Sequence, residues 1–302
     1  MNIALKIDVD TYEGTRVGVP ALVELLRRHD ARATFFFSLG PDHTGRAVRR
    51  VFRRGFLSKV SRTSVVENYG WKTLLYGTLL PGPNIGLKCA DIMRATQRAG
   101  FETAIHCWDH TRWQDFVTQK GREWTQRELK QAWLRYEQIF SESPRGIGAP
   151  GWQTTPNALA IQDEMGFAYC SDTRGAHPFL PLMEGKRFNC PQLPTTLPTL
   201  DELIGVDGVT EENVCEHLLE ASSKPGPAGH VFTLHAELEG RRYLPVLERL
   251  LQGWRKQGHQ LVALADLYAS LDLSTLPVHH VVNGQIPGRS GLLALQGKQV
   301  TA

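Results

Sequence analysis

Short apolar runs with strand character alternate with amphipathic helical patterns along most of the chain, and this alternation restricts the possible folds more than any other feature. The strand-like runs cover residues 3–7, 33–37, 101–105, 146–149, 167–170, 188–193, 230–234 and 260–264. The clearest helical patterns cover residues 20–29, 91–98, 125–140, 155–165, 211–221 and 244–257. This order predicts parallel βα units, which in a chain of 302 residues fit a single α/β domain over residues 1–272.

The charge and the cysteines argue against several classes of protein. A formal charge of +3 without any nucleic-acid-binding motif predicts no nucleic-acid partner. The five cysteines are scattered and form no C-x-x-C pair, which argues against a disulfide framework or a structural zinc site. The start MNIALKIDVD lacks the pattern of a signal peptide, and no apolar run is long enough for a membrane span. We therefore expect a cytoplasmic protein, either soluble or peripheral to a membrane.

Polar side chains follow the strand-like runs at the point where each run ends. In a parallel βα barrel the catalytic groups stand at this carboxyl-terminal rim. Loops are polar in general, but chance would not favour aspartate and histidine so strongly, so we predict the functional site here. The strand-end residues are Asp8, Asp10, Ser38, His106, His110, Trp152, Ser171, Asp172, Thr195 and His235.

Asp10, His106 and His110 form a candidate metal site. In the stretch IDVD, Asp8 and Asp10 point to the same side of a strand, where two carboxylates repel each other unless a cation or a proton intervenes. In the stretch HCWDH, histidines four residues apart share one face of a helical turn and can bind one ion. Each motif alone is also typical of a capping cluster or of ordinary polar histidines. Together, two histidines and one carboxylate leave positions on a divalent ion open for water or substrate.

His235 is a candidate for proton transfer. It ends the run 230–234 and is therefore expected at the same rim, within reach of a bound substrate. Glu237 has the same strand parity, and it either orients His235 or forms a surface salt bridge. Asp109, inside the HCWDH motif, is expected to face solvent or to support the metal ligands.

The ordered series KIDVD, HCWDH, APGW, YCSD and TLHAE resembles the motifs of the polysaccharide deacetylase, or NodB-homology, family of metal-dependent amide hydrolases. This resemblance implies a distorted (β/α)7–8 barrel with a long insertion after the second strand. Longer stretches between residues 3 and 270 are similar in particular to family members that remove the formyl group from 4-deoxy-4-formamido-L-arabinose-phosphoundecaprenol. These stretches are IDVDTYEGTRVGVP, FFFSLGPDHTGR, YGWKTLLYGT, PQLPTTLPTLDELIG and HAELEG.

The resemblance implies one role for each motif residue. Asp8 corresponds to the general base, His235 to the general acid, and Asp172 to the acid that supports the catalytic histidine. The three candidate ligands would hold one divalent ion (Zn, Mn or Co), whose identity the sequence leaves open.

The third motif departs from the family pattern. Many relatives have an arginine two residues before its proline, paired with the base, where this chain has Gly148; Arg145 is nearby but out of register. Further candidates for substrate contact are Trp152, Thr195 and Arg174.

The implied activity is hydrolysis of a formamide to a free amine and formate, a step toward lipid A that carries aminoarabinose and resists polymyxin and other cationic antimicrobial peptides. The implied partners are a lipid-linked sugar and the anionic cytoplasmic face of the inner membrane. Three alternatives stay open: a deacetylase of another N-acylated sugar, an Fe(II) oxygenase that uses the same ligand triad, and a non-catalytic sugar- or lipid-binding barrel. The oligomeric state is also open.

Two segments depart from the βα pattern. Residues 39–99 are far longer than a usual βα connection and include the basic stretch GRAVRRVFRRGFLSKVSR. This stretch predicts either an amphipathic helix packed on the barrel or a helix in the membrane interface. Its interfacial form would place Arg49, Arg50, Arg53 and Arg54 on anionic headgroups, and Trp71, Leu74, Leu75, Tyr76, Leu79 and Leu80 would extend the apolar surface. Residues 273–302 lose periodicity, and we expect a disordered tail there.

Overall fold

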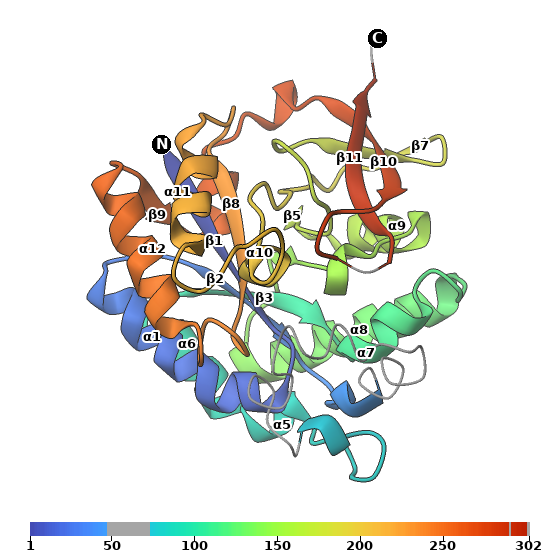
Figure 1. Cartoon of the computed structure of the whole chain (residues 1–302). Coiled ribbons are helices and arrows are strands. Elements are labelled where there is room, and N and C mark those ends of the chain that lie inside the picture. The colour runs from blue at the N-terminus through green and yellow to red at the C-terminus, as the bar shows by residue number, and fades with distance from the viewer. Residues whose placement is uncertain (47–72, 290, 301–302) are drawn as a thin grey trace.

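A curled parallel sheet forms the centre of the molecule (Figure 1), in a computed structural model that describes residues 1–46, 73–289 and 291–300. In spatial order its strands are β5 (Tyr169–Cys170), β4 (Gly146–Ile147), β3 (Glu102–Cys107), β2 (Thr34–Ser38), β1 (Asn2–Val9) and β8 (His230–His235). A further strand, β9 (Gln260–Val262), pairs with the beginning of β1. The pairings within this sheet are parallel, so the predicted α/β architecture is confirmed.

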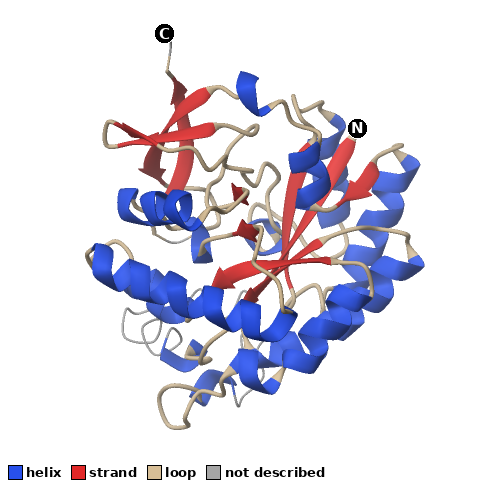
Figure 2. Cartoon of the chain, turned by 180° about the vertical axis from the view of Figure 1, so that it is seen from behind, coloured by secondary structure: helices blue, strands red, loops and turns tan. Residues whose placement is uncertain are grey.

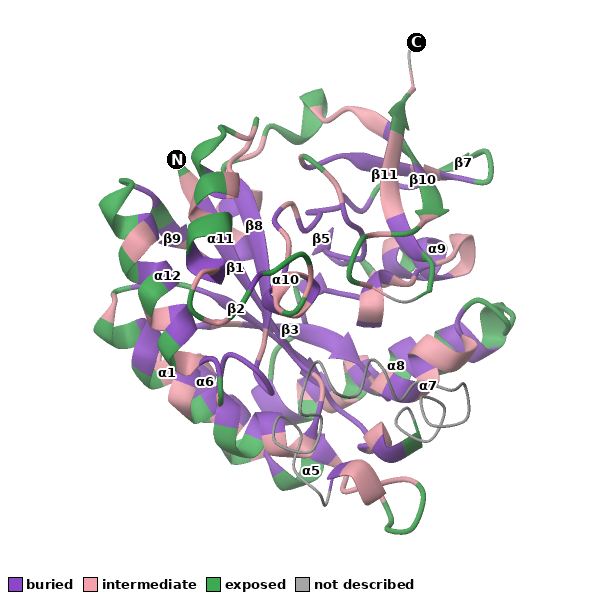
Figure 3. Cartoon of the chain, viewed as in Figure 1, coloured by how far each residue is buried: buried purple, intermediate pink, exposed green. Residues whose placement is uncertain are grey.

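Strand β1 shows how the sequence determines the two faces of the sheet. Side chains alternate between the faces of a strand. Ile3, Leu5 and Ile7 are fully buried in the core that the strands share with the surrounding helices. Ala4 belongs to a separate cluster inside the curl of the sheet, and Asp8 has the same parity. Figure 3 shows β1, β2, β3 and β8 as almost entirely buried, so a charged side chain on the inner face needs a partner.

Helices cover the outer face of the sheet (Figure 2). Among them, α1 (Val19–Arg28) packs a stripe of buried side chains, Val19, Leu22, Leu25 and Leu26, against the core. This spacing is that of an amphipathic helix, as the sequence predicts. Further helices are η1 (Gly14–Gly18), α6 (Ala90–Arg98), α7 (His110–Phe116), α8 (Arg122–Phe140), η3 (Pro150–Trp152), α9 (Pro156–Met165), α10 (Leu200–Leu203), α11 (Val214–Ser223), α12 (Leu244–Lys256), α13 (Leu264–Ala269) and η4 (Leu273–Thr275).

An irregular segment, residues 190–197, bridges the space between β5 and β8. On one side, the backbone N–H of Cys170 donates to the carbonyl of Pro191 at 2.8 Å. On the other side, the N–H of Thr196 donates to the carbonyl of Val231 at 3.0 Å. The segment therefore connects β5, at one edge of the curled sheet, with β8 at the other edge.

The sequence predicts a regular strand over residues 188–193, and this prediction is wrong. Pro191 and Pro194 lack a backbone N–H and cannot donate to a ladder of hydrogen bonds, so pairing there is limited to isolated bridges at Gln192 and Thr195.

The end of the chain forms part of a second sheet instead of a disordered tail. Strand β10 (Val278–Gly284) pairs in parallel with β6 (Leu180–Met183) and antiparallel with β11 (Leu293–Gln299). A short strand, β7 (Lys186–Arg187), completes this sheet on the other side of β6. Val281 and Ala294 are buried together with Phe179 and Phe188, so the expected disorder after residue 272 is contradicted for these strands.

The structure describes the long connection after β2 only in part. Residues 73–89 contain a short 3-10 turn, η2 (Thr73–Leu75), and a single helical turn, α5 (Ile85–Lys88). The basic stretch around Arg49 to Arg54 lies outside the described residues, so its predicted helix stays a prediction. In the part of the chain that is described, no helix combines the length and the apolar character that crossing a bilayer requires.

Candidate active site

The predicted residues from the first, third and eighth strands meet at one end of the sheet. Asp8, near the end of β1, is directly paired in register with His235, the last residue of β8. Asp10 follows β1 by one residue, and His106 lies near the end of β3. His110 is the first residue of α7, so the two histidines reach the site from a strand and from the helix that follows, not from one helical turn.

Asp10, His106 and His110 form a compact cluster. Nε2 of His106 lies 3.2 Å from Oδ1 of Asp10, and Nε2 of His110 lies 3.3 Å from Oδ2 of the same carboxylate. One nitrogen or oxygen from each of the three residues lies within 4.8 Å of the others. Burial acts to raise the pKa of Asp10, but the neighbouring His110 and His106 outweigh it and hold this pKa below its usual value.

The arrangement of His106 fits a bound cation. Its Nδ1 lies 2.7 Å from the carbonyl of Gly148 and donates a hydrogen bond there, which leaves Nε2 with a lone pair. That lone pair faces Oδ1 of Asp10, a buried oxygen with no hydrogen-bond donor among the described residues. Two lone pairs facing each other are stable only with a cation or a proton between them. A backbone carbonyl behind the ligand histidine is a common feature of metal sites.

Asp109 fixes the beginning of α7, the helix whose first residue is His110. It is buried, caps the beginning of α7 by accepting from the N–H of Arg112 at 3.0 Å, and contacts Nδ1 of His43 at 2.5 Å. Asp109 is buried, so the solvent-facing position is wrong; its contacts are with Arg112 and His43, and it acts on the candidate ligands only through α7, which begins at His110. His43 was not predicted, because no pattern in the sequence connects it with the HCWDH motif.

His235 has a buried carboxylate next to its backbone. Its N–H donates to Oε2 of Glu239 at 2.7 Å, and its Nδ1 is buried without a hydrogen-bond partner among the described residues. Burial raises the pKa of Glu239 to about 7, while the proximity of His235 acts in the opposite direction. Glu239 follows the strand by four residues, and its role was therefore not visible from strand parity.

Glu237 does not orient His235, and it forms no surface salt bridge. It is 1% exposed, and its Oε1 accepts hydrogen bonds from the backbone N–H groups of Asp10 and Thr11 at 3.0 and 2.7 Å. The hydroxyl of Thr11 donates to the same oxygen at 2.8 Å. Both alternatives from the sequence are wrong, because the chain turns after β8 and directs this side chain to the loop that holds Asp10.

Asp172 is not placed as a partner of His235. Its Oδ1 accepts from the N–H of Ala149 at 2.7 Å, and its Oδ2 accepts from the side chains of Gln162 and Gln192 at 2.9 and 3.3 Å. These contacts fix the third-motif loop next to β5. The role that the resemblance gives to Asp172 is therefore not supported by its contacts.

Trp152, Thr195 and Arg174 come together, but inside the protein. The indole N–H of Trp152 donates to the hydroxyl of Thr195 at 3.0 Å, and the guanidinium of Arg174 stacks on the Trp152 ring at 4.9 Å. Arg174 also pairs with Glu202. The three residues are between 1% and 8% exposed, which favours a structural role over the predicted contact with substrate.

Comparison with known proteins agrees with this arrangement of fold and site. A family model described as Polysaccharide deacetylase matches residues 3–170. The chain belongs to the polysaccharide deacetylase family. Membership in this family, and with it the prediction of an enzyme that hydrolyses a carbon–nitrogen amide bond, is therefore confirmed.

Two curated relatives in the family align along almost the whole chain. A protein of Shewanella sediminis named "Probable 4-deoxy-4-formamido-L-arabinose-phosphoundecaprenol deformylase ArnD" is 35% identical over 298 residues, covering 99% of this chain and 95% of the relative. A protein of Wigglesworthia glossinidia brevipalpis with the same name is 30% identical, covering 94% of this chain and 99% of the relative. Among solved structures, a putative polysaccharide deacetylase from Mycobacterium smegmatis superposes with a TM-score of 0.61 at 16% identity, covering 94% and 95% of the two chains. This last similarity supports the barrel-type fold.

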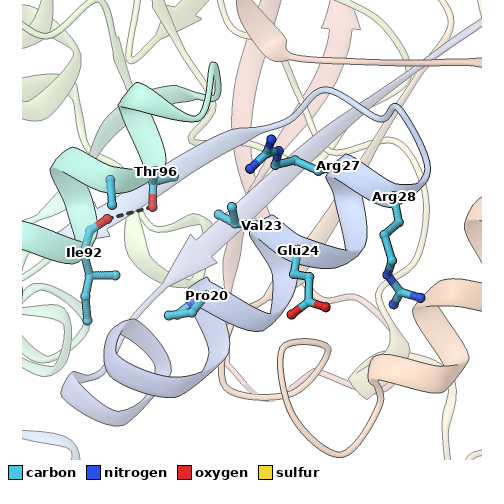
Figure 4. A pocket seen from close by; sticks show the side chains of 8 residues that line it. Pro20, Val23, Glu24, Arg27, Arg28, Ile92 and Thr96 are labelled. Carbon is cyan, nitrogen blue, oxygen red and sulfur yellow. Dashed lines mark hydrogen bonds between the residues drawn. The ribbon is translucent and has the colours of Figure 1, made fainter.

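A groove on the outer surface, between α1 and α6, is separate from the active site (Figure 4). Its floor is apolar and its edge carries charged side chains of α1; the lining residues are Pro20, Val23, Glu24, Arg27, Arg28, Ile92, Ala95 and Thr96. The hydroxyl of Thr96 is already bonded to the carbonyl of Ile92 at 3.0 Å within α6. Because no strand-end residue reaches this groove, we place the chemistry at the rim of the sheet.

Proposed function

We propose that this enzyme hydrolyses the formamide of 4-deoxy-4-formamido-L-arabinose-phosphoundecaprenol, with one divalent metal ion bound by Asp10, His106 and His110. The observation that carries the proposal is the juxtaposition of this cluster with Asp8 and His235, which are in register on neighbouring strands. The two curated relatives, whose names give this substrate, support the choice of a formyl group over an acetyl group.

The residues of the chain divide the chemistry between them. Oδ1 of Asp8 is buried and has no hydrogen-bond partner among the described residues, so it is available to take a proton from the attacking water. The imidazole of His235 gives a proton to the departing nitrogen as the carbon–nitrogen bond breaks. A divalent ion, when bound, would polarise the formyl oxygen and lower the pKa of a water molecule. The products are formate and a free amine, which is protonated at neutral pH.

Formate release without oxygen tests this proposal. The purified protein, reconstituted separately with Zn, Mn and Co, is incubated anaerobically with formylated and acetylated aminoarabinose lipids. The products are then identified and quantified by mass spectrometry. We expect one formate for each amine produced, and loss of both products in the Asp10→Ala variant. An oxygenase would be inactive without oxygen, and a binding module would release nothing. Faster release of acetate than of formate would instead identify a deacetylase.

The proposal includes a cytoplasmic location at the inner membrane, since the substrate is a polyprenyl lipid. The described part of the long connection supports this location: Leu79 and Leu87 are 80% and 66% exposed, respectively, and Leu80 is 39% exposed. Exposed leucines on one connection are typical of a surface that contacts lipid. In this setting the reaction converts a neutral formamide into a cation, and the amine later reduces the attraction of lipid A for polymyxin.

Binding to liposomes tests the membrane contact. Replacing Leu79, Leu80 and Leu87 by serine should weaken binding to anionic vesicles, because burial of one leucine contributes about 1.5–3 kcal/mol. Hydrolysis of a short-chain soluble substrate should not change. Leu134, which is 47% exposed on α8, provides the matched control, and its replacement by serine should leave vesicle binding intact. Equal binding by the triple variant and the wild type would exclude this surface as the lipid contact.

A further inference from the structure

Lys6 is a lysine inside the barrel. It lies in the middle of β1, its side chain is 0% exposed, and it has the same strand parity as Asp8. Lysine is almost never fully buried unless it is paired, because an ammonium group loses its hydration when it is removed from water. The run IALKIDV shows the anomaly already in the sequence, because Lys6 and Asp8 are the only charged residues among apolar ones. A specific set of contacts is therefore required to keep Lys6 in this place.

The contacts of Lys6 converge on the catalytic rim. Its Nζ lies 3.4 Å from Oδ2 of Asp8 and donates to the carbonyl of Ser171 at 3.0 Å. The ammonium also lies 5.3 Å from the centre of the Phe36 ring and 5.5 Å from that of Trp152, distances at which a cation is attracted to an aromatic ring. Two oxygens and two rings thus surround the ammonium.

The side chain of Lys6 passes close to Gly148. A Cβ added to Gly148 would lie 3.2 Å from Cε of Lys6 and 3.1 Å from the ring of Phe36, closer than most real contacts of this kind. The same residue offers its carbonyl to His106. Glycine at this position therefore leaves space for the lysine stem while its backbone supports a metal-ligand candidate.

The two oxygens of Asp8 have different surroundings. Oδ2 contacts Lys6, whereas Oδ1 is buried without a hydrogen-bond partner among the described residues and lies 3.9 Å from Nδ1 of His106. We propose that Lys6 is a positioning residue for the reaction: its ammonium holds Oδ2, so that Oδ1 faces the reacting water. This inference rests on the proposed hydrolysis, in which Asp8 accepts the proton. Lys6, on β1, thus provides the cation that pairs with the base, which the family resemblance would place as an arginine at position 148.

Two substitutions test the role of Lys6. Lys6→Met retains the length of the stem and removes the charge, and it should lower kcat about 100-fold, the scale of a misplaced general base, with KM within about threefold of the wild type. The metal content should stay at the wild-type level, since none of the three ligand candidates is altered. Lys6→Arg restores a cation, and its kcat should be at least about tenfold higher than that of Lys6→Met. If Lys6→Met does not fold, Lys6→Gln takes its place with the same expected loss.

A matched control separates positioning from stability. Glu102, at the opposite end of β3, accepts hydrogen bonds from Tyr169 and from the N–H of Ala265 at 2.8 and 2.9 Å. Glu102→Gln should lower Tm but leave kcat unchanged. The inference is overturned if folded, metal-loaded Lys6→Met keeps kcat within about threefold of the wild type, or if Lys6→Arg is no more active than Lys6→Met. Failure of the wild type to release formate would reject the proposed function instead, so the two failures are distinguishable.

Discussion

Replacement of Glu237 by alanine is expected to cost about 3–5 kcal/mol of unfolding free energy. One oxygen of this buried carboxyl group accepts three hydrogen bonds, from the N–H groups of Asp10 and Thr11 and from the Thr11 hydroxyl. Truncation leaves these donors without an acceptor, and each unsatisfied buried group costs about 1–3 kcal/mol. The loop packs tightly around this carboxyl group, since a Cβ on Gly14 would lie 1.9 Å from Oε1 of Glu237. The loop therefore has little freedom to bring another acceptor to these donors.

Glutamine at the same position is the informative comparison. Its carbonyl oxygen can accept the same three hydrogen bonds, so Glu237→Gln should stay within about 1 kcal/mol of the wild type in urea unfolding. In the alanine variant, the loop that carries Asp10 loses its anchor. The affinity of the alanine variant for the metal should therefore decrease about 10–100-fold, as it does when a residue that orients a metal ligand is removed. Equal destabilisation by glutamine and alanine, or an alanine variant as stable as the wild type, would refute this explanation of the loop.

Three further outcomes follow from the structure. Replacing His235 by alanine should lower kcat about 10²–10⁴-fold with unchanged metal content, measured by steady-state kinetics and elemental analysis; wild-type kcat would exclude it as the acid. Ending the chain after residue 277 removes the buried Val281 and Leu293 and should cost about 3–6 kcal/mol in denaturant unfolding, whereas an unchanged midpoint would show that the second sheet is dispensable. Burial raises the pKa of Glu128 from 4.5 to about 7, so the folded state binds this proton more tightly, and stability should decrease as pH rises through that window. Glu128→Gln should remove this decrease and increase Tm relative to the wild type at pH 8 but not at pH 4.

The sequence predicts the central part of the fold well because its strands and helices have strong periodic patterns. β1, β2, β3 and β8 are mainly apolar and almost entirely buried, as expected for strands buried on both faces. The same runs locate the site, since the carboxyl ends of parallel strands lie on one side of a sheet. This reasoning is sufficient to bring Asp8, Asp10, His106 and His235 to one rim.

The second sheet escapes prediction because its strands have weak patterns. The run VHHVVNG mixes valines with histidine, asparagine and glycine and has no clear alternation of apolar and polar residues. Only His279 and Val281 of β10 are buried. Its partner β6 is distant in the sequence, and their pairing depends on tertiary contacts. The positions of Asp172 and Glu237 escape prediction for a similar reason: each side chain is directed by groups from distant segments, such as Gln192 and Thr11.

The central position of β1 has a consequence for the synthesis of the protein. This strand is translated well before β8 and β9, yet Ile3 pairs with His230 and Asn2 pairs with Gln260. One edge of β1 therefore stays without its native partners until most of the chain has been translated, and contacts so distant in sequence form slowly. An unpaired apolar strand is prone to join other chains. We expect that fragments ending before residue 230 aggregate, and that chaperones which shield nascent chains increase the yield of the folded enzyme.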